Sequence, residues 1–174
     1  MTAITEKLLA GDSTVGAAVR RGVGISVVRE AVTDAVWEDH VSGFDGACQE
    51  QLTTFSRHRW PGMAQEAMVF RAGTEIVGGC LVMIQRLPLG AASIAIAKWG
   101  PILARVGTAD DRRVYAAMVD ALVEEYAVRR RMMVSILPRA STGNGNAEHE
   151  HLIARGFRPG AALPFPDRYF VNLG

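Results

Sequence analysis

The sequence predicts a single α/β domain of the α+β type, in which a mixed, largely antiparallel sheet is flanked by helices. Three stretches rich in strand-forming residues follow one another at 66–71, 75–86 and 91–99, with short turn signals between them. A long segment beginning near residue 108 then repeats its apolar residues at helical spacing. The chain has 174 residues, of which 49% are hydrophobic, enough for one core. The expected order is β-α-α-β-β-β-α-β-α-β.

The first third of the chain predicts a leader, a strand and two helices. Residues 1–23 have no sustained apolar period, so we expect a weakly structured leader there and a single domain over 24–174. The stretch 24–32 is rich in β-branched residues and predicts a strand. Thr33 follows it and can cap a helix. A second helix is expected over 47–58, before a Trp-Pro-Gly stop.

The second half of the chain predicts the longest helix and the end of the sheet. Thr108 and Asp111 have the spacing of a capping box, and the apolar stripe that follows continues through Arg131. The remaining predicted elements are a strand at 132–137, a helix at 147–155 closed by Gly156, and a last strand at 169–173.

Charge and composition limit the classes of function. With 19 basic and 18 acidic residues the formal net charge is +1, so no overall field favours nonspecific binding to nucleic acid or anionic membranes. Cys48 and Cys80 lack a second thiol at metal or redox spacing and are expected to be packing residues. The most apolar stretch, 76–84, is too short to span a bilayer, and no secretion signal is apparent. We therefore expect a cytoplasmic protein without a membrane span.

Three local stretches resemble a known family. The segment 152–159 (LIARGFRP) is similar to the helix, Gly-Phe, strand turn of the acyltransferases of the GNAT superfamily. The segments 77–90 (VGGCLVMIQRLPLG) and 95–103 (AIAKWGPIL) resemble the strand, Arg-x-Pro-x-Gly, strand, Gly-Pro signature of the FemAB-like branch. The resemblance implies a transferase that moves an aminoacyl or acyl group onto an amine of a cell-wall or exopolysaccharide precursor. No resident cofactor is implied, and acyl-CoA or aminoacyl-tRNA would be the donor substrate.

The chain also departs from the pattern of these enzymes. Acetyl-CoA-dependent members hold the pyrophosphate with a glycine-rich loop before the long helix, whereas residues 100–111 here lack the glycines and end in two acids. FemAB-like proteins lack that loop too, but they contain two such domains and carry an arginine where this chain has Trp99. A single domain therefore predicts a homodimer that supplies the second half, or else a fragment of a longer protein. It also leaves open a noncatalytic module that binds itself or a partner, and a CoA-dependent acetyltransferase with an atypical loop.

Acyl transfer to an amine needs a group that polarises the carbonyl and a way to remove the amine proton. In this fold a strand splay beside the Gly-Pro segment can expose backbone N–H groups, so residues 96–101 are the first candidates. Lys98 and Tyr169 are the predicted catalytic residues, and Trp99 is predicted to stack on substrate. An ordinary strand pair at Lys98, and a packing role for Tyr169 as for Tyr115 and Tyr126, are the structural alternatives.

A run of cations and aromatics at the end of the second helix is the predicted substrate-binding site. Arginine can bind phosphate and tryptophan can stack on a base, as a nucleotide-linked precursor or a tRNA end requires. The alternative is that cations favour a helix C-terminus while the tryptophan packs under the sheet. With Lys98 these residues would line one cleft. They are Arg57, His58, Arg59 and Trp60.

Three other polar segments admit a structural explanation. The arginines at 129–131 suit a helix C-terminus, with a tRNA contact as the alternative. Histidines two apart, His149 and His151, point to different sides of a helix, so no metal site is predicted. The polar loop 141–146 has ordinary loop composition and could also act as a lid.

Overall fold

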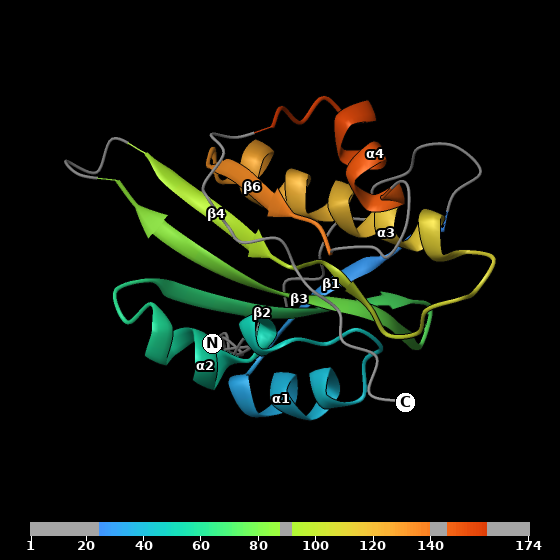
Figure 1. The fold of residues 1–174 in the computed structure, drawn as a ribbon, viewed down its shortest axis with the longest axis horizontal. Helices are drawn as coiled ribbons and strands as arrows, with labels where there is room; N and C mark the ends of the chain where they lie inside the picture. The colour runs from blue at the N-terminus through green and yellow to red at the C-terminus, as the bar shows by residue number, and fades with distance from the viewer. Residues whose placement is uncertain (1–24, 88–91, 140–145, 160–174) are drawn as a thin grey trace, which may run out of the picture.

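The computed structural model describes residues 25–87, 92–139 and 146–159. Its six-stranded sheet has the order β1-β2-β3-β4-β6, with the short β5 also pairing with β3 (Figure 1). Neighbouring strands are antiparallel except β4 and β6, which are parallel. The predicted mixed, largely antiparallel sheet is therefore confirmed. The strands are β1 (Val28–Val32), β2 (Ala64–Ala72), β3 (Glu75–Arg86), β4 (Ser93–Lys98), β5 (Ile102–Leu103) and β6 (Met133–Leu137).

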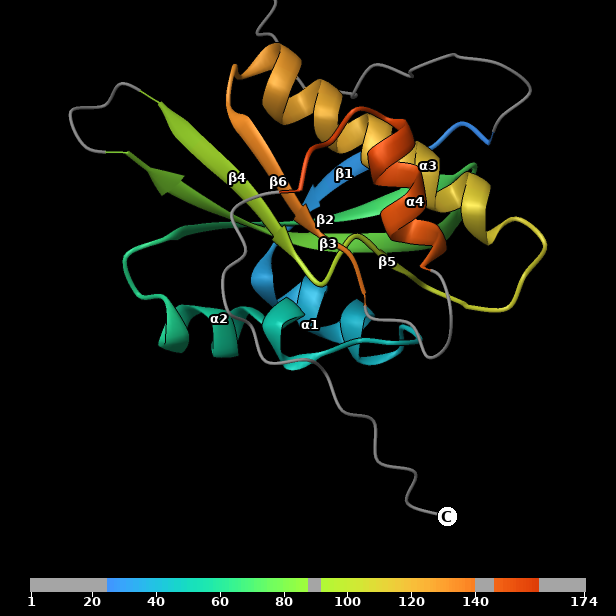
Figure 2. The same cartoon turned by 45° about the horizontal axis from the view of Figure 1, so that its top comes forward.

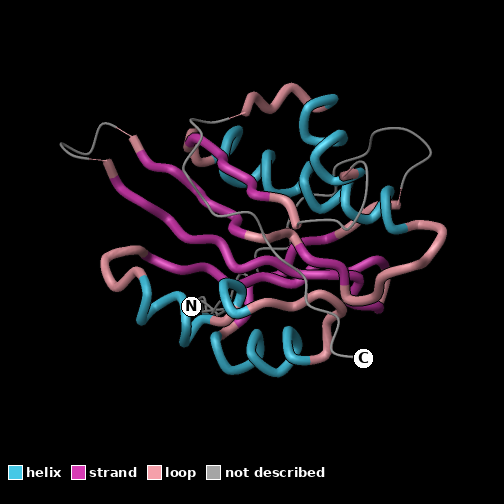
Figure 3. The backbone as a smooth tube through the Cα atoms, viewed as in Figure 1, coloured by secondary structure: helices cyan, strands magenta, loops and turns pink. Residues whose placement is uncertain are grey.

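Helices cover both faces of the sheet. Figures 1 and 3 show α1 and α2 below the strands and α3 with α4 above them. The long helix changes from α-helical to π-helical geometry after two thirds of its length. The helical elements are α1 (Asp34–Ser42), the 3₁₀ turn η1 (Gln49–Gln51), α2 (Thr53–Arg59), α3 (Asp111–Leu122), its π-helical continuation η3 (Val123–Arg129) and α4 (Ala147–Ala154).

Most predicted elements occur where the sequence places them. Thr33 caps α1 by accepting a hydrogen bond from the Val36 N–H. The prediction of one helix over 47–58 is wrong in its first half, because the extended backbone of Cys48 and Leu52 restricts residues between them to a single 3₁₀ turn. The leader at 1–23, the loop at 141–146 and the last strand at 169–173 lie outside the described residues.

Two hydrophobic cores lie on opposite faces of the sheet because successive strand residues point to opposite sides. On one face, alternate residues of β2, β3 and β4, such as Val82 and Ala97, pack against α3 and η3, where Met118 is one of the contacting residues. On the other face, Trp37 and Val41 of α1 pack against the remaining strand residues. Trp37 is fully buried, and removing such a side chain from water stabilises the fold by roughly 3 kcal/mol.

Two adjacent glycines let both layers approach β3 closely. A Cβ atom at Gly79 would lie 2.3 Å from the Trp37 ring, and one at Gly78 would lie 2.4 Å from the Ile102 carbonyl oxygen. No side chain can occupy such space without moving backbone or a buried indole. The pair Gly78 and Gly79 therefore sets how deeply α1 sits under the sheet and allows β5 to pair with β3.

The strand formed by residues 93–103 is interrupted in its middle. β4 pairs with β3 as far as Ala97 opposite Val82, and β5 resumes pairing at Ile102 opposite Gly79. Between them Trp99 adopts a positive φ of 56°, and the peptide before Pro101 is cis. Between these two pairs the strand has four residues, 98–101, whereas β3 has only two, 80 and 81. The backbone of the longer stretch therefore bulges out of the sheet. The bulge separates the two regions that carry the functional candidates.

The arginines at the end of η3 have structural partners. Arg129 pairs with Glu125 one turn earlier, and Arg130 forms two hydrogen bonds, 2.6 and 2.9 Å long, with the Glu66 carboxylate of β2. The Tyr126 hydroxyl donates to the same carboxylate at 2.8 Å. Burial raises the pKa of Glu66, but these hydrogen bonds outweigh it and the pKa is lowered. Arg130 thus holds the helix end to the sheet, while Arg129 forms an ion pair within the helix.

Candidate functional site

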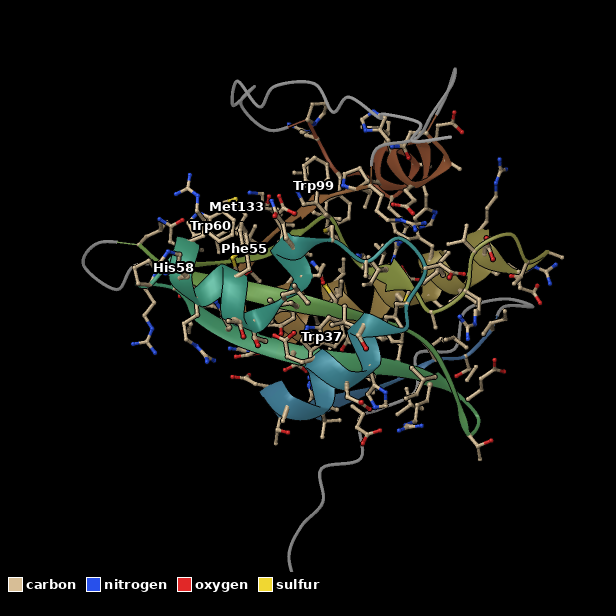
Figure 4. The ribbon with its side chains drawn as sticks, turned by 60° about the horizontal axis from the view of Figure 1, so that its bottom comes forward. Trp37, Phe55, His58, Trp60, Trp99 and Met133 are labelled. Carbon is tan, nitrogen blue, oxygen red and sulfur yellow. The ribbon has the colours of Figure 1, made fainter. Side chains whose placement is uncertain are left out.

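The structure brings together part of the predicted substrate-binding set at the end of α2. The Lys98 ammonium of β4 lies 4.2 Å from the centre of the Trp60 ring, and the Arg59 guanidinium lies 5.6 Å from it. Phe55 meets Trp60 edge to face, with ring centres 6.2 Å apart. Figure 4 shows Phe55 and Trp60 side by side at this end of the sheet. We call these four residues the cation–aromatic cluster.

Other members of the predicted set lie elsewhere. Arg57 pairs with the exposed Asp34 at the start of α1. His58 is exposed. Trp99 is half-buried at the bulge, and Figure 4 shows it apart from Trp60. Tyr169 lies outside the described residues. The expected single cleft over residues 57–60 and 98 is therefore reduced to a contact among Lys98, Arg59 and Trp60.

A buried glutamine closes the gap left by the bulge. The Gln51 side chain is fully buried; its oxygen accepts from the Leu81 N–H at 2.8 Å, while its nitrogen donates to the Lys98 carbonyl. The Gln51 carbonyl in turn accepts from the Trp37 indole N–H. The side-chain amide thus replaces the ladder bonds that β3 and β4 lose there. The Leu81 N–H is therefore not available to a substrate carbonyl.

A cavity of about 630 Å³ lies on the other face, where the strands diverge. β6 follows β4 as far as Leu137 opposite Lys98, whereas β5 crosses toward β3, and α4 lies along the first half of α3 above this opening (Figure 2). A volume of this size is typical of small-ligand sites. The lining residues are Leu103, Thr108, Ala109, Asp111, Arg112, Tyr115, Arg139, Ala147, Glu148, Glu150, His151 and Ala154.

Two aromatic residues in the cavity wall carry buried polar atoms that bond to no described residue. The Tyr115 hydroxyl and the His151 Nε2 are both buried, and neither has a hydrogen-bond partner among the residues that the structure describes. Their rings meet edge to face at 6.0 Å. Burial, and then the nearby Glu148 carboxylate, raise the pKa of Tyr115, while burial lowers the pKa of His151. A neutral phenol and a neutral imidazole therefore line this cavity at neutral pH.

Charged groups of the cavity wall are largely neutralised by one another. Arg139, just after β6, donates from two guanidinium nitrogens to Glu148 Oε1 at 2.8 and 2.6 Å, and its backbone N–H donates to the other oxygen. Both side chains of this ion pair are mostly buried. Asp111, Glu150 and Arg112 complete the charged lining, which thus contains three acids and two arginines. The cavity does not form a positive pocket for an anion.

The histidines of α4 do not form a metal site with their neighbours. His151 turns toward Tyr115, whereas His149 is exposed. Within residues 25–87, 92–139 and 146–159, no three His, Cys, Asp or Glu side chains come together in a way that could hold a metal ion. Burial raises the pKa of the Cys80 thiol, so it stays protonated and is a poor nucleophile.

Sequence reasoning missed the cavity because its walls come from four separate segments. The sequence predicts only a packing role for Tyr115, and it raises His151 only in connection with metal binding. Gln51 carried no signal, since a glutamine within a predicted helix is usually exposed. The Gly-Pro dipeptide at 100–101 was the one useful signal, because it marks the bulge.

Comparisons with known proteins agree on the fold. In the described part of the chain no helix is both long and apolar enough to cross a membrane. No protein-family model matches the sequence, and no curated protein matches it. Among solved structures, a crystal structure of FemX superposes with a TM-score of 0.59 and 17% identity over 75% of this chain. A crystal structure of a probable acetyltransferase gives 0.50 and 12% over 85%.

The two similar structures differ in how much of their own length is matched. The chain spans 32% of the FemX chain but 97% of the probable acetyltransferase. At such low identity the likeness concerns the arrangement of helices and strands, and it agrees with the resemblance found in the local motifs. The chain therefore shares the mixed fold of these two structures.

Proposed function

We propose that the protein transfers an acyl or aminoacyl group to an amine, and that the reaction takes place in the cavity between α3 and α4. One observation carries this proposal: a 630 Å³ cavity opens where β5 and β6 diverge, beside an interrupted strand, and contains a buried phenol and a buried imidazole without described partners. Buried polar groups without partners cost stability, so they mark a site that a ligand completes.

The neutral forms of Tyr115 and His151 suit this chemistry. The amine nitrogen attacks the carbonyl carbon of the donor ester or thioester, and the bond from that carbon to the donor's oxygen or sulfur breaks. A neutral His151 can accept the proton that the amine loses, and the Tyr115 hydroxyl can donate to the leaving oxygen or sulfur. No covalent enzyme intermediate is required. The finer assignment is a FemAB-like enzyme acting on an amine of a cell-wall or exopolysaccharide precursor in the cytoplasm.

The cation–aromatic cluster is the alternative position for the same activity. In that version Lys98 and Tyr169 are catalytic, and the residues that bind a nucleotide-linked precursor or a tRNA end are Arg57, His58, Arg59, Trp60 and Trp99. Its support is the contact of Lys98 and Arg59 with one indole ring. The cavity is preferred because the ammonium of Lys98 already faces the Trp60 ring, and Arg57 is paired with Asp34.

Two sets of substitutions separate the positions. Transfer of labelled acyl groups from acyl-CoA and from aminoacyl-tRNA to nucleotide-linked amino sugars is measured for Y115F with H151A, and for R59A with K98A. The first pair is expected to lose at least about a hundredfold in kcat, since one positioned proton-transfer group contributes at least that much. Arg113→Ala, which removes an exposed cation of α3, is the control. Full activity of the first pair together with loss in the second would move the site to the cluster.

A second candidate function is a noncatalytic module that pairs with itself or with another chain. The observation that favours it is the coverage of only 32% of the FemX chain. β1 and β6 are the outer strands of the described sheet, and an uncovered strand edge can pair with another chain, so a homodimer is proposed here too. Sedimentation at high concentration distinguishes monomer from dimer. Thermal shift with acyl-CoA, acetyl-CoA and nucleotide-sugars distinguishes the functions, because a ligand of the native state raises its stability.

A further inference from the structure

The start of α3 is a wall of the cavity and carries its own anion. The Asp111 carboxylate accepts hydrogen bonds from the Gly107 N–H at 2.7 Å and the Thr108 N–H at 3.0 Å, and also from the Thr108 hydroxyl. Backbone N–H groups before a helix, together with the positive end of its dipole, are what a phosphate group binds in proteins. In this chain a side chain from the helix itself fills that place.

The loop that holds the Asp111 carboxylate borders two cavities, so this carboxylate affects which ligands can bind there. Asp111 and Thr108 line both the 630 Å³ cavity and a second cavity of about 330 Å³ on the other side of the loop. Gly107, with a φ of +92°, and Thr108 are both exposed. Their N–H groups lie in a loop that solvent reaches, and the Asp111 carboxylate is the group that accepts from them.

Of the two arginines in the cavity wall, Arg112 is exposed next to Asp111, and Arg139 is neutralised. The guanidinium of Arg139 is held by Glu148 in a mostly buried ion pair, and Glu150 adds a further negative charge. One turn after Asp111, the Tyr115 ring forms part of the cavity wall; only 3% of this residue's surface is exposed, and its hydroxyl lacks a partner among the described residues. The cavity thus offers an uncharged hydrogen-bonding group behind a carboxylate.

We infer that Asp111 is a specificity-determining residue: its carboxylate closes the start of α3 to phosphate groups, so that the adjoining cavity accepts acyl donors without a diphosphate at this position. The closure of the loop stands on geometry alone, whereas the selection among donors rests on the proposed function. Hydrogen bonds from Thr108 and Gly107 keep this carboxylate charged at neutral pH, because they outweigh the effect of burial and lower its pKa.

The test follows the amide resonances of Gly107 and Thr108 in the ¹⁵N-labelled full chain during titration with inorganic phosphate. In the wild type we expect no saturable shift. In Asp111→Ser we expect saturable shifts of both amides over the phosphate concentrations at which the wild type shows none. Asp110→Ser is the matched control, because it removes the same charge one residue earlier and leaves the bonds of Asp111 in place.

Several outcomes overturn the inference. These are a saturable response of the wild type, no response of Asp111→Ser, or an equal response of Asp110→Ser, which would reduce the effect to net charge. If Asp111→Ser loses the dispersed spectrum of a folded chain, Asp111→Asn replaces it. The carboxamide has one acceptor oxygen instead of two, so a weaker but saturable shift is expected, and its absence also overturns the inference.

A second arm concerns the donor. The kcat/KM of Asp111→Ser with an acyl-CoA donor is expected to rise at least about tenfold over the wild type, and an unchanged ratio overturns the selection among donors. If no variant transfers acyl groups but Asp111→Ser responds to phosphate, the proposed function fails. The inference that the Asp111 carboxylate keeps phosphate from the Gly107 and Thr108 N–H groups is then still supported. If the enzyme is active but Asp111→Ser shows no phosphate response, the proposed function stands and the inference about Asp111 fails.

Discussion

The cation–aromatic cluster and the α3–α4 cavity lie on opposite faces of one sheet, and they are built in opposite ways. The cluster comes mainly from residues adjacent in sequence, and its cations contact an aromatic ring of the same cluster. The cavity is assembled from β5, the start of α3, the end of β6 and α4, and it retains buried polar atoms without described partners. Polar groups that satisfy one another hold a fold together, whereas groups left unsatisfied mark where a ligand is needed.

The largest expected effect comes from substituting Gln51, which lies at the bulge between the two regions. Gln51→Leu keeps a side chain of similar length but leaves the Leu81 N–H and the Lys98 carbonyl without their partner. Two unsatisfied buried groups should cost about 3 kcal/mol of unfolding free energy, measured by chemical denaturation. Gln49→Leu, on the same 3₁₀ turn, is the control and should change stability little. A cost below about 1 kcal/mol would mean that water can replace the amide.

The cavity predicts an unusual result for a hydroxyl deletion. Tyr115→Phe removes a buried group without a described partner, so we expect the free energy of unfolding to rise by about 1 kcal/mol and Tm by about 3 °C. Tyr126→Phe is the matched control, because its hydroxyl donates to Glu66 and its loss should destabilise by about 1 kcal/mol. If calorimetry found both variants equally destabilised, the Tyr115 hydroxyl would have a partner in solution.

The cluster predicts a smaller change. Lys98→Met keeps the aliphatic stem under the sheet and removes the ammonium that faces Trp60. Loss of a partly exposed cation–π contact should cost about 0.5 kcal/mol in chemical denaturation. Combining it with Trp60→Ala should give less than the sum of the two single effects, because both remove the same contact. Strict additivity would show that Lys98 and Trp60 do not interact, and Lys98 would then not belong to the cluster.

The smallest expected effect is a pH dependence that belongs to the cavity. Burial lowers the pKa of His151 in the folded state below its ordinary value of 6.5, with Asp120 opposing and Arg155 reinforcing the shift. The unfolded chain therefore binds the proton more readily, and stability is lost as pH falls below about 6.5 toward the folded pKa. The other titratable or charged groups of this cavity are Tyr115, Asp111, Glu148, Glu150, Arg112 and Arg139.

Comparison of wild type with His151→Phe isolates that contribution. The aromatic substitution keeps the edge-to-face contact with Tyr115 while removing the titrating group. Thermal unfolding between pH 7.5 and 5 should show a shallower loss of stability in the variant. An identical slope in both proteins would mean that His151 is as accessible to protons in the folded chain as in the unfolded one.

The order of helices and strands followed from the sequence, because β-branched runs, turn residues and helical apolar stripes are local signals. Strand residues at 75–86 and the stripe from Val114 to Tyr126 are examples. The second helix was overestimated, since apolar spacing at 47–58 does not reveal that the backbone around Gln51 is committed to a contact with two strands. The contacts of Gln51 with the two strands override the local helix propensity there.

By itself, then, the sequence determined the kinds of most of the described elements and their order, because both depend on neighbours along the chain. The tertiary structure alone decided that Lys98 meets Trp60, that Tyr115 and His151 share a cavity, and that Asp111 fills the start of its own helix loop. These depend on which face of the sheet a side chain reaches and on how far two strands diverge, and no local pattern encodes such distances.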